Sequence, residues 1–428
     1  MNFVGRKFTA VLQTSPIAMG VGLFSIAFLV RLAVVIHFRT YEDLARYELE
    51  RTAISLAQTG VYGNPYAVPT GPTAHVSPGY TVILAALFHF FGTATGAEII
   101  KELLAAAVSS LEIALLPGVA VTLTLSKRAG LLAGLVMALY PARPLVEVDG
   151  DWESPYVALA LMAAAVLAAQ LWKNRDLRGR IAVRHGVGWG VVLLFVSAML
   201  PLFAAFVIMD GFWLRHQLRR YLVFAALEII AVAACLAPWT VRNYFALGAP
   251  IVTRSNNGIE LRISNNDLAV SDQRENMLDG LFHRYHPLQS RAEALKVRQL
   301  GEIEYNRKLL AEAKQWIYSH PQRFLELTLG RIRCFWFYID PTSRTKTAFL
   351  WLIDALGFVG LVIALRRKPV AGVALGLIAL VYPLPNYLVH VGLRQSYPVE
   401  WFMLLLASSL ASGALERIEE PVPELAAV

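Results

Sequence analysis

Carboxylates gather in the first long polar stretch of the chain, which follows an apolar segment. Glu42, Asp43, Glu48 and Glu50 all fall on a helix that the spacing of apolar residues predicts over 42–58. A carboxylate within hydrogen-bond reach of a hydroxyl group can take its proton, which accelerates a transfer reaction by roughly 10²–10⁴-fold. The same spacing also fits an ordinary solvated helix face with oppositely charged neighbours.

A second acidic group, Asp149, Asp151 and Glu153, lies between two apolar runs. Oxygen ligands of this kind suit a divalent cation such as Mg²⁺ or Mn²⁺. They can equally orient the substrate that accepts a transferred group, and a solvated loop is the plain alternative. We therefore predict that no cofactor is required, or that a divalent cation binds at Glu48, Asp151 and Glu153.

Basic and polar side chains near the predicted membrane surface are candidates for substrate binding. Arg242 follows Pro238 and Trp239 at the end of an apolar run, where an arginine can bind phosphate through two parallel hydrogen bonds. An interfacial arginine beside a belt tryptophan is the common alternative. Arg394 fits the same two interpretations. The other residues that we predict to bind substrate are His75, Tyr80, Asn243, Asn256 and His390.

The composition is that of a membrane protein. Of 428 residues, 56% are hydrophobic and only 16% are charged, whereas soluble domains carry about 25% charged residues. Several apolar runs approach the ~20 residues that a helix needs to cross a bilayer. The runs are continuous and do not alternate with polar residues, which argues against a transmembrane barrel.

Positively charged loops set the orientation of the predicted spans. The basic loops at 127–128, 173–184, 215–220 and 366–368 all fall on one side, as cytoplasmic loops do. This agreement supports about ten transmembrane helices and puts the acidic and polar motifs together on the outer side. Proline divides one apolar run into two short helices, and one short apolar helix is expected at the membrane interface. The expected helices are Ile17–Ile36, Thr81–Phe91 (interfacial), Leu103–Leu125, Ala129–Val146, Pro155–Trp172, Val187–Leu214 (divided at Pro201), Val223–Trp239, Phe349–Leu365, Val370–Leu388 and Val399–Leu410.

We therefore predict an all-α integral membrane protein with three parts. Residues 1–239 form a transmembrane core, whose outer loop at 38–96 carries the first group of acids. Residues 240–346 form a helical outer domain, and residues 347–428 hold the C-terminal transmembrane helices and a cytoplasmic tail.

Charge and cysteine content exclude some partners. The net charge of +8 is expected at cytoplasmic flanks beside anionic membrane lipids, and no basic stripe with interleaved aromatic residues indicates nucleic acid. Cys235 and Cys334 lack the spacing of a metal or redox motif. We interpret both cysteines as packing residues.

Three acids within apolar runs support an alternative function. Glu112, Asp210 and Glu228 would be costly in a membrane unless they had a role. They would form the centre of a transporter or lipid flippase, and Arg31 could pair with one of them.

Six groups of short motifs occur in order along most of the chain, and all are predicted on its outer side. They are Glu48-x4-Ala53-x-Ser55-Leu56-x3-Gly60, Gly71-Pro72-Thr73-Ala74 with Pro78-Gly79-Tyr80, Trp152-Glu153, Pro238-Trp239-Thr240-x-Arg242-Asn243, Ser255-Asn256-Asn257-Gly258 with Asn265-Asn266, and the segment 394–400. Together they resemble the GT-C glycosyltransferases that use polyprenyl-phosphate-linked sugars. The chain looks most similar to the bacterial protein-mannosyltransferase-like group (family 39).

The resemblance implies a GT-C bundle that moves a sugar from a polyprenyl-phosphate donor to the hydroxyl of a glycan, lipid or protein acceptor. It implies a hexosyl- or pentosyltransferase that spans the inner membrane several times, with its site facing the periplasm. An acid of the first outer loop would act as base or metal ligand while the sugar carbon inverts. By position this acid is best Glu48, with Glu42, Asp43 or Glu50 as alternatives. A non-catalytic relative that assists assembly is a third hypothesis.

Overall fold

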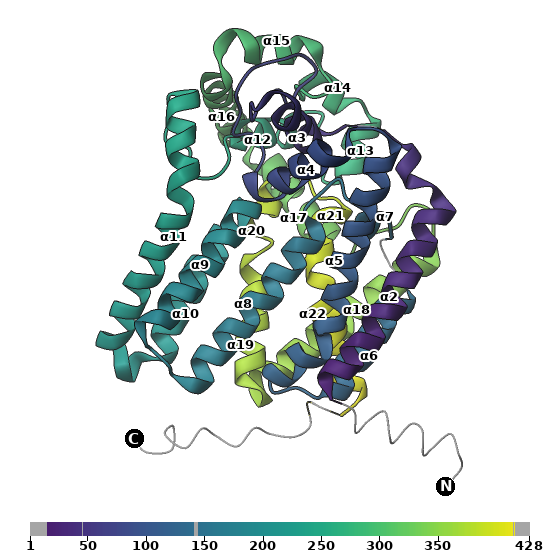
Figure 1. Cartoon of the computed structure of the whole chain (residues 1–428), viewed down its shortest axis with the longest axis vertical. Coiled ribbons are helices and arrows are strands. Elements are labelled where there is room, and N and C mark those ends of the chain that lie inside the picture. Colours follow the sequence, from purple (N-terminus) through teal and green to yellow (C-terminus); the bar gives the residue numbers. More distant parts are fainter. Residues whose placement is uncertain (1–14, 45, 141–143, 414, 416–428) are drawn as a thin grey trace.

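The structure is a computed structural model that describes residues 15–44, 46–140, 144–413 and 415. The secondary structure of these residues consists of helices and isolated β-bridges, and the described part contains no strand (Figure 1). The helices are α2 (Pro16–Phe38), η1 (Thr40–Glu42), α3 (Glu48–Thr59), α4 (Pro78–Phe91), α5 (Thr95–Thr122), α6 (Lys127–Leu139), α7 (Pro144–Val148), α8 (Ser154–Asn174), α9 (Gly179–Phe195), η2 (Ser197–Met199), α10 (Leu200–Trp213), η3 (Arg215–Gln217), α11 (Leu218–Leu247), α12 (Asn257–Ser264), α13 (Gln273–Leu278), α14 (Leu281–Tyr285), α15 (Arg291–Leu300), α16 (Glu302–Ser319), α17 (Pro321–Trp336), α18 (Arg344–Arg367), α19 (Pro369–Val381), α20 (Leu384–Leu388), α21 (Leu393–Ser396), η4 (Tyr397–Val399) and α22 (Glu400–Ala411).

The helices form two layers, a bundle of long apolar helices and a cap of shorter helices above it (Figure 1). In the bundle, α2 packs against α5 and α6 at one edge, and α9 packs against α11 at the other. The cap contains α12 to α16 together with α3, which comes from the first polar stretch of the chain, and the apolar helix α4 that follows it. The fold therefore brings the acidic first loop against the segment that follows α11.

Six of the described helices are long and apolar enough to cross a membrane, and α4 and the segment 197–213 are shorter apolar helices. The predicted all-α integral membrane fold is confirmed by these helices. The number of about ten spans stays a prediction, because several helices of the bundle are shorter than the ~20 residues that a straight crossing needs.

Proline has different effects at two predicted boundaries. The run around Pro201 is divided as predicted, into α9 and α10, and the Trp189 ring on α9 lies 5.3 Å from the Phe203 ring on α10. At Pro238 the prediction was wrong, because α11 continues through the proline to Leu247. A proline removes only one backbone hydrogen bond, and contacts to neighbouring segments can hold the helix beyond it.

The helix of the first loop begins later than its apolar spacing indicated. Helix α3 starts at Glu48 and not at Glu42, because Tyr47 is extended with φ −84° and ψ 175°. Its end was predicted correctly at Gly60, which has φ 72° and caps the helix. Glycine reaches this left-handed conformation without the steric cost of a Cβ atom.

The cap has its own core, and one glycine sets how closely two of its helices pack. Helices α12 and α16 cross at Gly258, where an added Cβ would lie 2.0 Å from the carbonyl oxygen of Asn306. Backbone cannot move away as a flexible side chain can, so a larger residue must separate the two helices.

We therefore expect Gly258→Val to destabilise the cap by about 1–3 kcal/mol, the usual cost of overpacking. The measurement is thermal unfolding of the purified protein in detergent. Gly22→Ala is the matched control, because nothing lies within 4 Å of a Cβ at that position. A Gly258→Val protein as stable as the control would contradict the close crossing.

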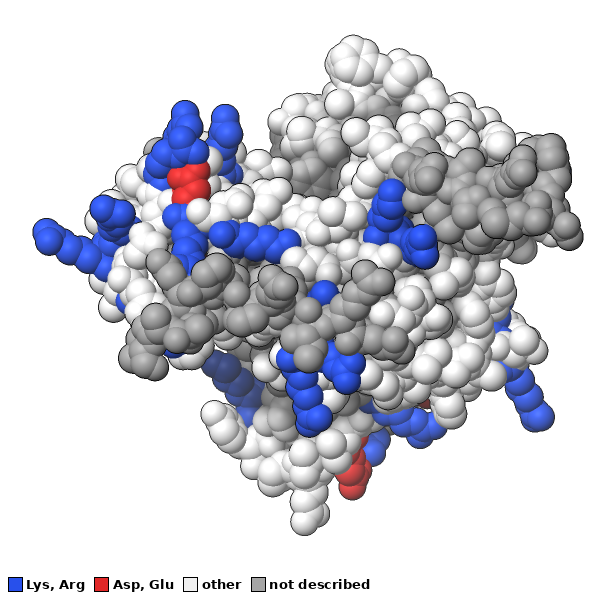
Figure 2. All heavy atoms as spheres, turned by 90° about the horizontal axis from the view of Figure 1, so that it is seen from below, with Lys and Arg blue, Asp and Glu red and all other residues white. Residues whose placement is uncertain are grey.

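Lys and Arg side chains gather on the end of the molecule opposite the cap, where Asp and Glu are few (Figure 2). The α5–α6, α8–α9, α10–α11 and α18–α19 connections lie at that end of the bundle (Figure 1). These connections hold the four basic loops singled out in the sequence. Such clustering is typical of the cytoplasmic side of a membrane protein.

Candidate active site

The loop between α3 and α4 is held by contacts that only the tertiary structure provides. Arg242 on α11 donates to the carbonyl oxygens of Thr73 and Tyr62, at 2.7 and 2.6 Å. It also donates to the Asn243 side-chain oxygen at 3.0 Å. Phosphate binding by Arg242 stays a prediction, but the geometry gives this guanidinium and Asn243 a different task, which is to hold the loop.

A carboxylate from the cap fastens the same loop from the other side. Glu302, the first residue of α16, accepts from the Ala74 N–H at 2.8 Å, from the Ser255 hydroxyl at 2.5 Å and from the Thr73 hydroxyl. Burial raises the pKa of Glu302, and these hydrogen bonds oppose the shift. Sequence reasoning missed Glu302, since nothing local distinguishes it from other acids at helix starts.

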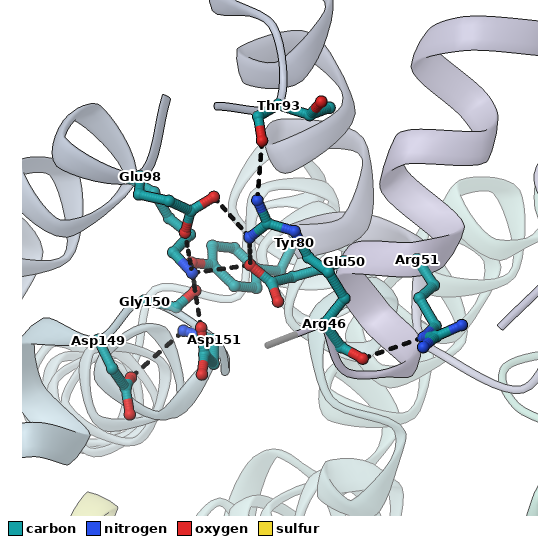
Figure 3. Close-up of polar contacts among 10 residues, drawn as sticks. Arg46, Glu50, Arg51, Tyr80, Thr93, Glu98, Asp149, Gly150 and Asp151 are labelled. Carbon is teal, nitrogen blue, oxygen red and sulfur yellow. Dashed lines mark hydrogen bonds and ion pairs between the residues drawn. The ribbon is translucent and has the colours of Figure 1, made fainter. Parts of the chain in front are cut away.

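Acids from three segments surround one lysine under the cap, and we call Glu50, Glu98, Asp149 and Asp151 the acidic cluster (Figure 3). The Lys101 Nζ lies 2.7 Å from Glu50, 2.8 Å from Glu98 and 2.6 Å from Asp151. The fold thereby joins α3, the start of α5 and the turn before α8.

A second cation, Arg46, contacts the same cluster. It lies 2.5 Å from Glu98 and 3.3 Å from Glu50, so the Arg46–Glu50 pair expected on a helix face is present. Glu50 is fully buried between the two cations. Burial raises the pKa of Glu50 to about 7, and Lys101 and Arg46 oppose this shift. We infer that Glu50 holds the first loop against α5, because it pairs with Lys101 on that helix.

Asp149 and Asp151 are the members of the cluster that come from the turn before α8. The Asp151 N–H donates to the Asp149 side chain at 3.2 Å, and the Tyr80 hydroxyl donates to the Gly150 carbonyl. Burial and then the negative charge of Asp151 raise the pKa of Asp149 to about 8. Burial also raises the pKa of Asp151, although Lys101 opposes this shift.

The raised pKa of Asp149 predicts a pH dependence of stability. Its pKa rises from the ordinary aspartate value of 3.8 to about 8 in the folded chain, so between these values the folded state holds a proton that the unfolded state has lost. Stability from this group is complete below about pH 4 and is lost as the pH rises to about 8. We expect Asp149→Asn to flatten the fall in melting temperature between pH 5 and 8, and an unchanged slope would contradict it.

The four acids predicted as catalytic lie in different surroundings. Glu42 is exposed and pairs with Arg39, Glu48 lies 3.1 Å from His286, and Glu50 is enclosed by cations. Asp43 is exposed, and its negative charge contributes to the raised pKa values of Asp151 and Tyr47. The charge of Asp43 therefore acts on the acidic cluster.

Arg394 is a cation of the site that has no acid partner among the described residues. Its guanidinium lies over the Trp152 ring at 3.6 Å from the centroid, and within the described residues it makes no ion pair or side-chain hydrogen bond. Burial lowers the pKa of Arg394, and the charges of Glu153, Glu260 and Glu48 oppose this shift. An arginine held flat on an indole with its N–H groups unused is suited to bind an anion.

Glu48, His75 and His286 are all buried, and each offers a ligand atom within 4.8 Å of the others. A metal ion could bridge a group with this spacing. The predicted set, Glu48, Asp151 and Glu153, stays a prediction, and it shares only Glu48 with this group. His286 could not be found from the sequence, because it lies far along the chain.

The remaining predicted binding residues lie around these two sites. Asn256 donates to Glu260 at 3.0 Å on the N-terminal turn of α12. His390 contacts the Ser264 hydroxyl at 2.9 Å, and burial lowers the pKa of His390 to about 4. The charge of Arg394 also contributes to the lowered pKa of His390.

The intramembrane acids have separate partners and do not converge. Glu112 accepts from the Tyr397 hydroxyl at 2.7 Å, and Asp210 accepts from the Trp172 indole at 2.5 Å. Glu228 lies 4.0 Å from His185. Arg31 pairs with Glu147 at 2.6 Å, so its predicted pairing with one of these three acids was wrong. The transporter alternative is therefore not favoured.

The fold defines a class, the GT-C membrane fold. Among solved structures the chain resembles the archaeal oligosaccharyltransferase AglB from Archaeoglobus fulgidus in complex with an inhibitory peptide and a dolichol-phosphate. The TM-score is 0.53 at 14% identity, over 92% of this chain and 50% of that one. The apo form of the Archaeoglobus fulgidus oligosaccharyltransferase gives 0.55 at 13% identity, over 92% and 50%.

A complex of the same oligosaccharyltransferase with Zn and sulfate gives a TM-score of 0.51 at 15% identity, over 91% of this chain and 48% of that one. The chain thus spans about half the length of these proteins. No family model and no curated protein matches the chain. The predicted GT-C fold is confirmed by this likeness.

Proposed function

We propose that the protein is a membrane glycosyltransferase that moves a sugar from a polyprenyl-phosphate donor to an acceptor hydroxyl. The observation that carries this proposal is Arg394, a half-buried guanidinium on Trp152 with no acid partner, next to the turn that holds Asp149 and Asp151. A donor phosphate would supply the missing negative charge through charge-assisted hydrogen bonds.

Asp43 is the base in this proposal. It takes the proton of the acceptor hydroxyl, the acceptor oxygen bonds to the sugar C1, and the bond from C1 to the phosphate oxygen breaks with inversion. The electron pair leaves with the polyprenyl phosphate, whose charge Arg394 stabilises. Asp149 and Asp151 orient the acceptor, and Lys101 keeps Asp151 in place at 2.6 Å.

The solved structures that share the fold support the substrate classes of the proposal. One of them is a complex with a dolichol-phosphate and an inhibitory peptide, and another is tethered to an acceptor peptide. We propose a lipid-linked hexose or pentose as donor and a glycan, lipid or protein as acceptor for this chain. No step of the proposed transfer depends on a divalent cation such as Mg²⁺ or Mn²⁺.

We also propose that the protein belongs with the bacterial protein-mannosyltransferase-like group and lies in the inner membrane. The basic end opposite the cap would face the cytoplasm, as in the positive-inside rule (Figure 2). The cap and the acidic cluster would then face the periplasm, where lipid-linked sugars can reach them from the outer leaflet.

The test is transfer by the purified protein in lipid vesicles. Polyprenyl-phosphate-linked hexose and pentose are supplied as donors, and the release of polyprenyl phosphate and the mass of the glycosylated product are measured. We expect release that depends on the acceptor and is lost in Arg394→Gln. Wild-type protein that releases no polyprenyl phosphate from either donor with glycan, lipid and peptide acceptors would overturn the proposal.

A further inference from the structure

Three buried side chains from distant segments meet beside the acidic cluster, and the proposed transfer reaction does not use them. Glu48 begins α3, His75 lies in the loop before α4, and His286 follows α14 in the cap. Their exposed fractions are 6%, 2% and 4%. Their ligand atoms lie within 4.8 Å of one another, and the His286 Nε2 is 3.1 Å from the Glu48 Oε1.

The donor set indicates which metal fits. Two imidazoles and one carboxylate are a ligand set for Zn²⁺, whereas Mg²⁺ and Mn²⁺ prefer oxygen ligands. Zinc bonds of 2.0–2.2 Å in a tetrahedron separate neighbouring ligand atoms by about 3.4 Å. The 3.1 Å between the His286 Nε2 and the Glu48 Oε1 is close to that edge, and a water can complete the tetrahedron.

A second layer of contacts orients one of the two rings. The Tyr66 hydroxyl lies 2.9 Å from the His75 Nδ1, which leaves the Nε2 of this ring for the metal. Metal-bound histidines commonly use their other nitrogen in such a contact, and this fixes the ring and its tautomer. The Tyr66 ring also packs edge-on against His75, with centroids 5.1 Å apart.

One contact opposes metal binding. The Leu288 N–H donates to the His286 Nδ1 at 3.1 Å, so in the metal-free ring the proton is on Nε2. A metal at Nε2 must displace that proton and this hydrogen bond. One hydrogen bond contributes about a tenth of the free energy with which structural zinc binds, so the metal outweighs it.

Acids near the three ligands favour a cation. Arg254, whose Nε donates to the His75 carbonyl at 2.8 Å, and Arg394 are the nearby cations, and Glu260 is one further acid. Glu302 is another, because it accepts from the N–H of Ala74, the neighbour of His75, at 2.8 Å. Glu48, Glu260 and Glu302 therefore outnumber the two arginines.

We propose that Glu48, His75 and His286 form a zinc site that ties the first loop to the cap. The zinc joins α3, the loop before α4 and the end of α14, and so fixes the segment that presents Asp43 and Tyr47. Glu48 is then a ligand and not the base of the transfer. Zinc binding at this site does not depend on the identity of the sugar or of the acceptor, so the site is tested separately from the proposed function.

The experiment measures zinc and thermal unfolding on the full-length protein in detergent. Wild-type protein made in zinc-supplemented medium should retain about one zinc per chain after dialysis, and His75→Ala and His286→Ala should lose it. The matched control is His283→Ala, an exposed histidine of the same short helix α14, which should keep wild-type zinc. Equal zinc in all four proteins means adventitious binding at the surface and overturns the proposal.

A second measurement uses only the wild-type protein, so it does not depend on whether a variant folds. A chelator should lower the melting temperature of the wild-type protein, and added Zn²⁺ should restore it. Co²⁺ in place of zinc should give the strong visible absorption of a tetrahedral site. The zinc site would be overturned if the wild-type protein held no zinc and its melting temperature changed with neither chelator nor Zn²⁺. That result would leave the transferase proposal unaffected.

Discussion

Asp43→Asn should lower the rate of sugar transfer by at least about 10²-fold while leaving donor binding unchanged. The physical reason is that asparagine keeps the size and hydrogen bonds of aspartate but cannot accept the proton of the acceptor, and a positioned base contributes roughly 10²–10⁴-fold. The effect should fall on kcat more than on KM, because proton transfer occurs in the transition state. The measurement is the initial rate of polyprenyl phosphate release in vesicles.

Two further variants show whether a loss of transfer in Asp43→Asn is specific to this residue. Asp279→Asn changes an exposed aspartate of the cap and should transfer sugar at the wild-type rate. Glu48→Gln should lose zinc and thermal stability together. If Glu48→Gln instead kept its zinc and stability but lost all transfer, while Asp43→Asn stayed active, the base would be Glu48 and the assignment of Asp43 would be wrong.

Arg394→Gln should weaken both donor binding and turnover, with a loss in kcat/KM of about 10²–10³-fold. Removing a donor that stabilises developing negative charge commonly has an effect of this size. The guanidinium of Arg394 lies flat on Trp152 with its N–H groups unused by described side chains. Arg394→Lys should recover only part of the activity, because an ammonium group keeps the charge but loses the two parallel hydrogen bonds.

Donor binding separates this role from a structural one. A fluorescent polyprenyl-phosphate should bind the wild-type protein and bind weakly to Arg394→Gln, whereas thermal unfolding should be similar for both. Arg291→Gln, at an exposed position of α15, is the matched control. Unchanged binding in Arg394→Gln together with normal turnover would remove phosphate recognition from this arginine.

The sequence alone determined the broad architecture. Continuous apolar runs, basic loops on one side and polar motifs on the other predicted a helical membrane bundle, and the helices of the structure follow them. Local backbone chemistry also agrees with the helix ends at Gly60, which ends α3, and at Pro321, which begins α17. These features follow from the solvation and conformation of neighbouring residues, so a single sequence carries them.

Partners in the site could not be predicted, because they come from residues far apart in the chain. Glu50 looked like Glu48 by spacing, but Lys101 encloses Glu50 and His286 lies beside Glu48. One local signal was overlooked, since a lysine in the first turns of the apolar helix α5 is costly unless acids surround it.

Arg242 and Arg394 also show the difference between what the sequence predicts and what only the tertiary structure decides. Both are arginines beside apolar runs on the predicted outer side, and no feature of the sequence distinguishes their roles. The tertiary structure directs Arg242 at the carbonyl oxygens of the first loop and leaves Arg394 on an indole ring. Hydrophobic runs determine which helices enter the membrane, whereas packing of the cap on the bundle decides which charged groups are paired and which are left to bind a substrate.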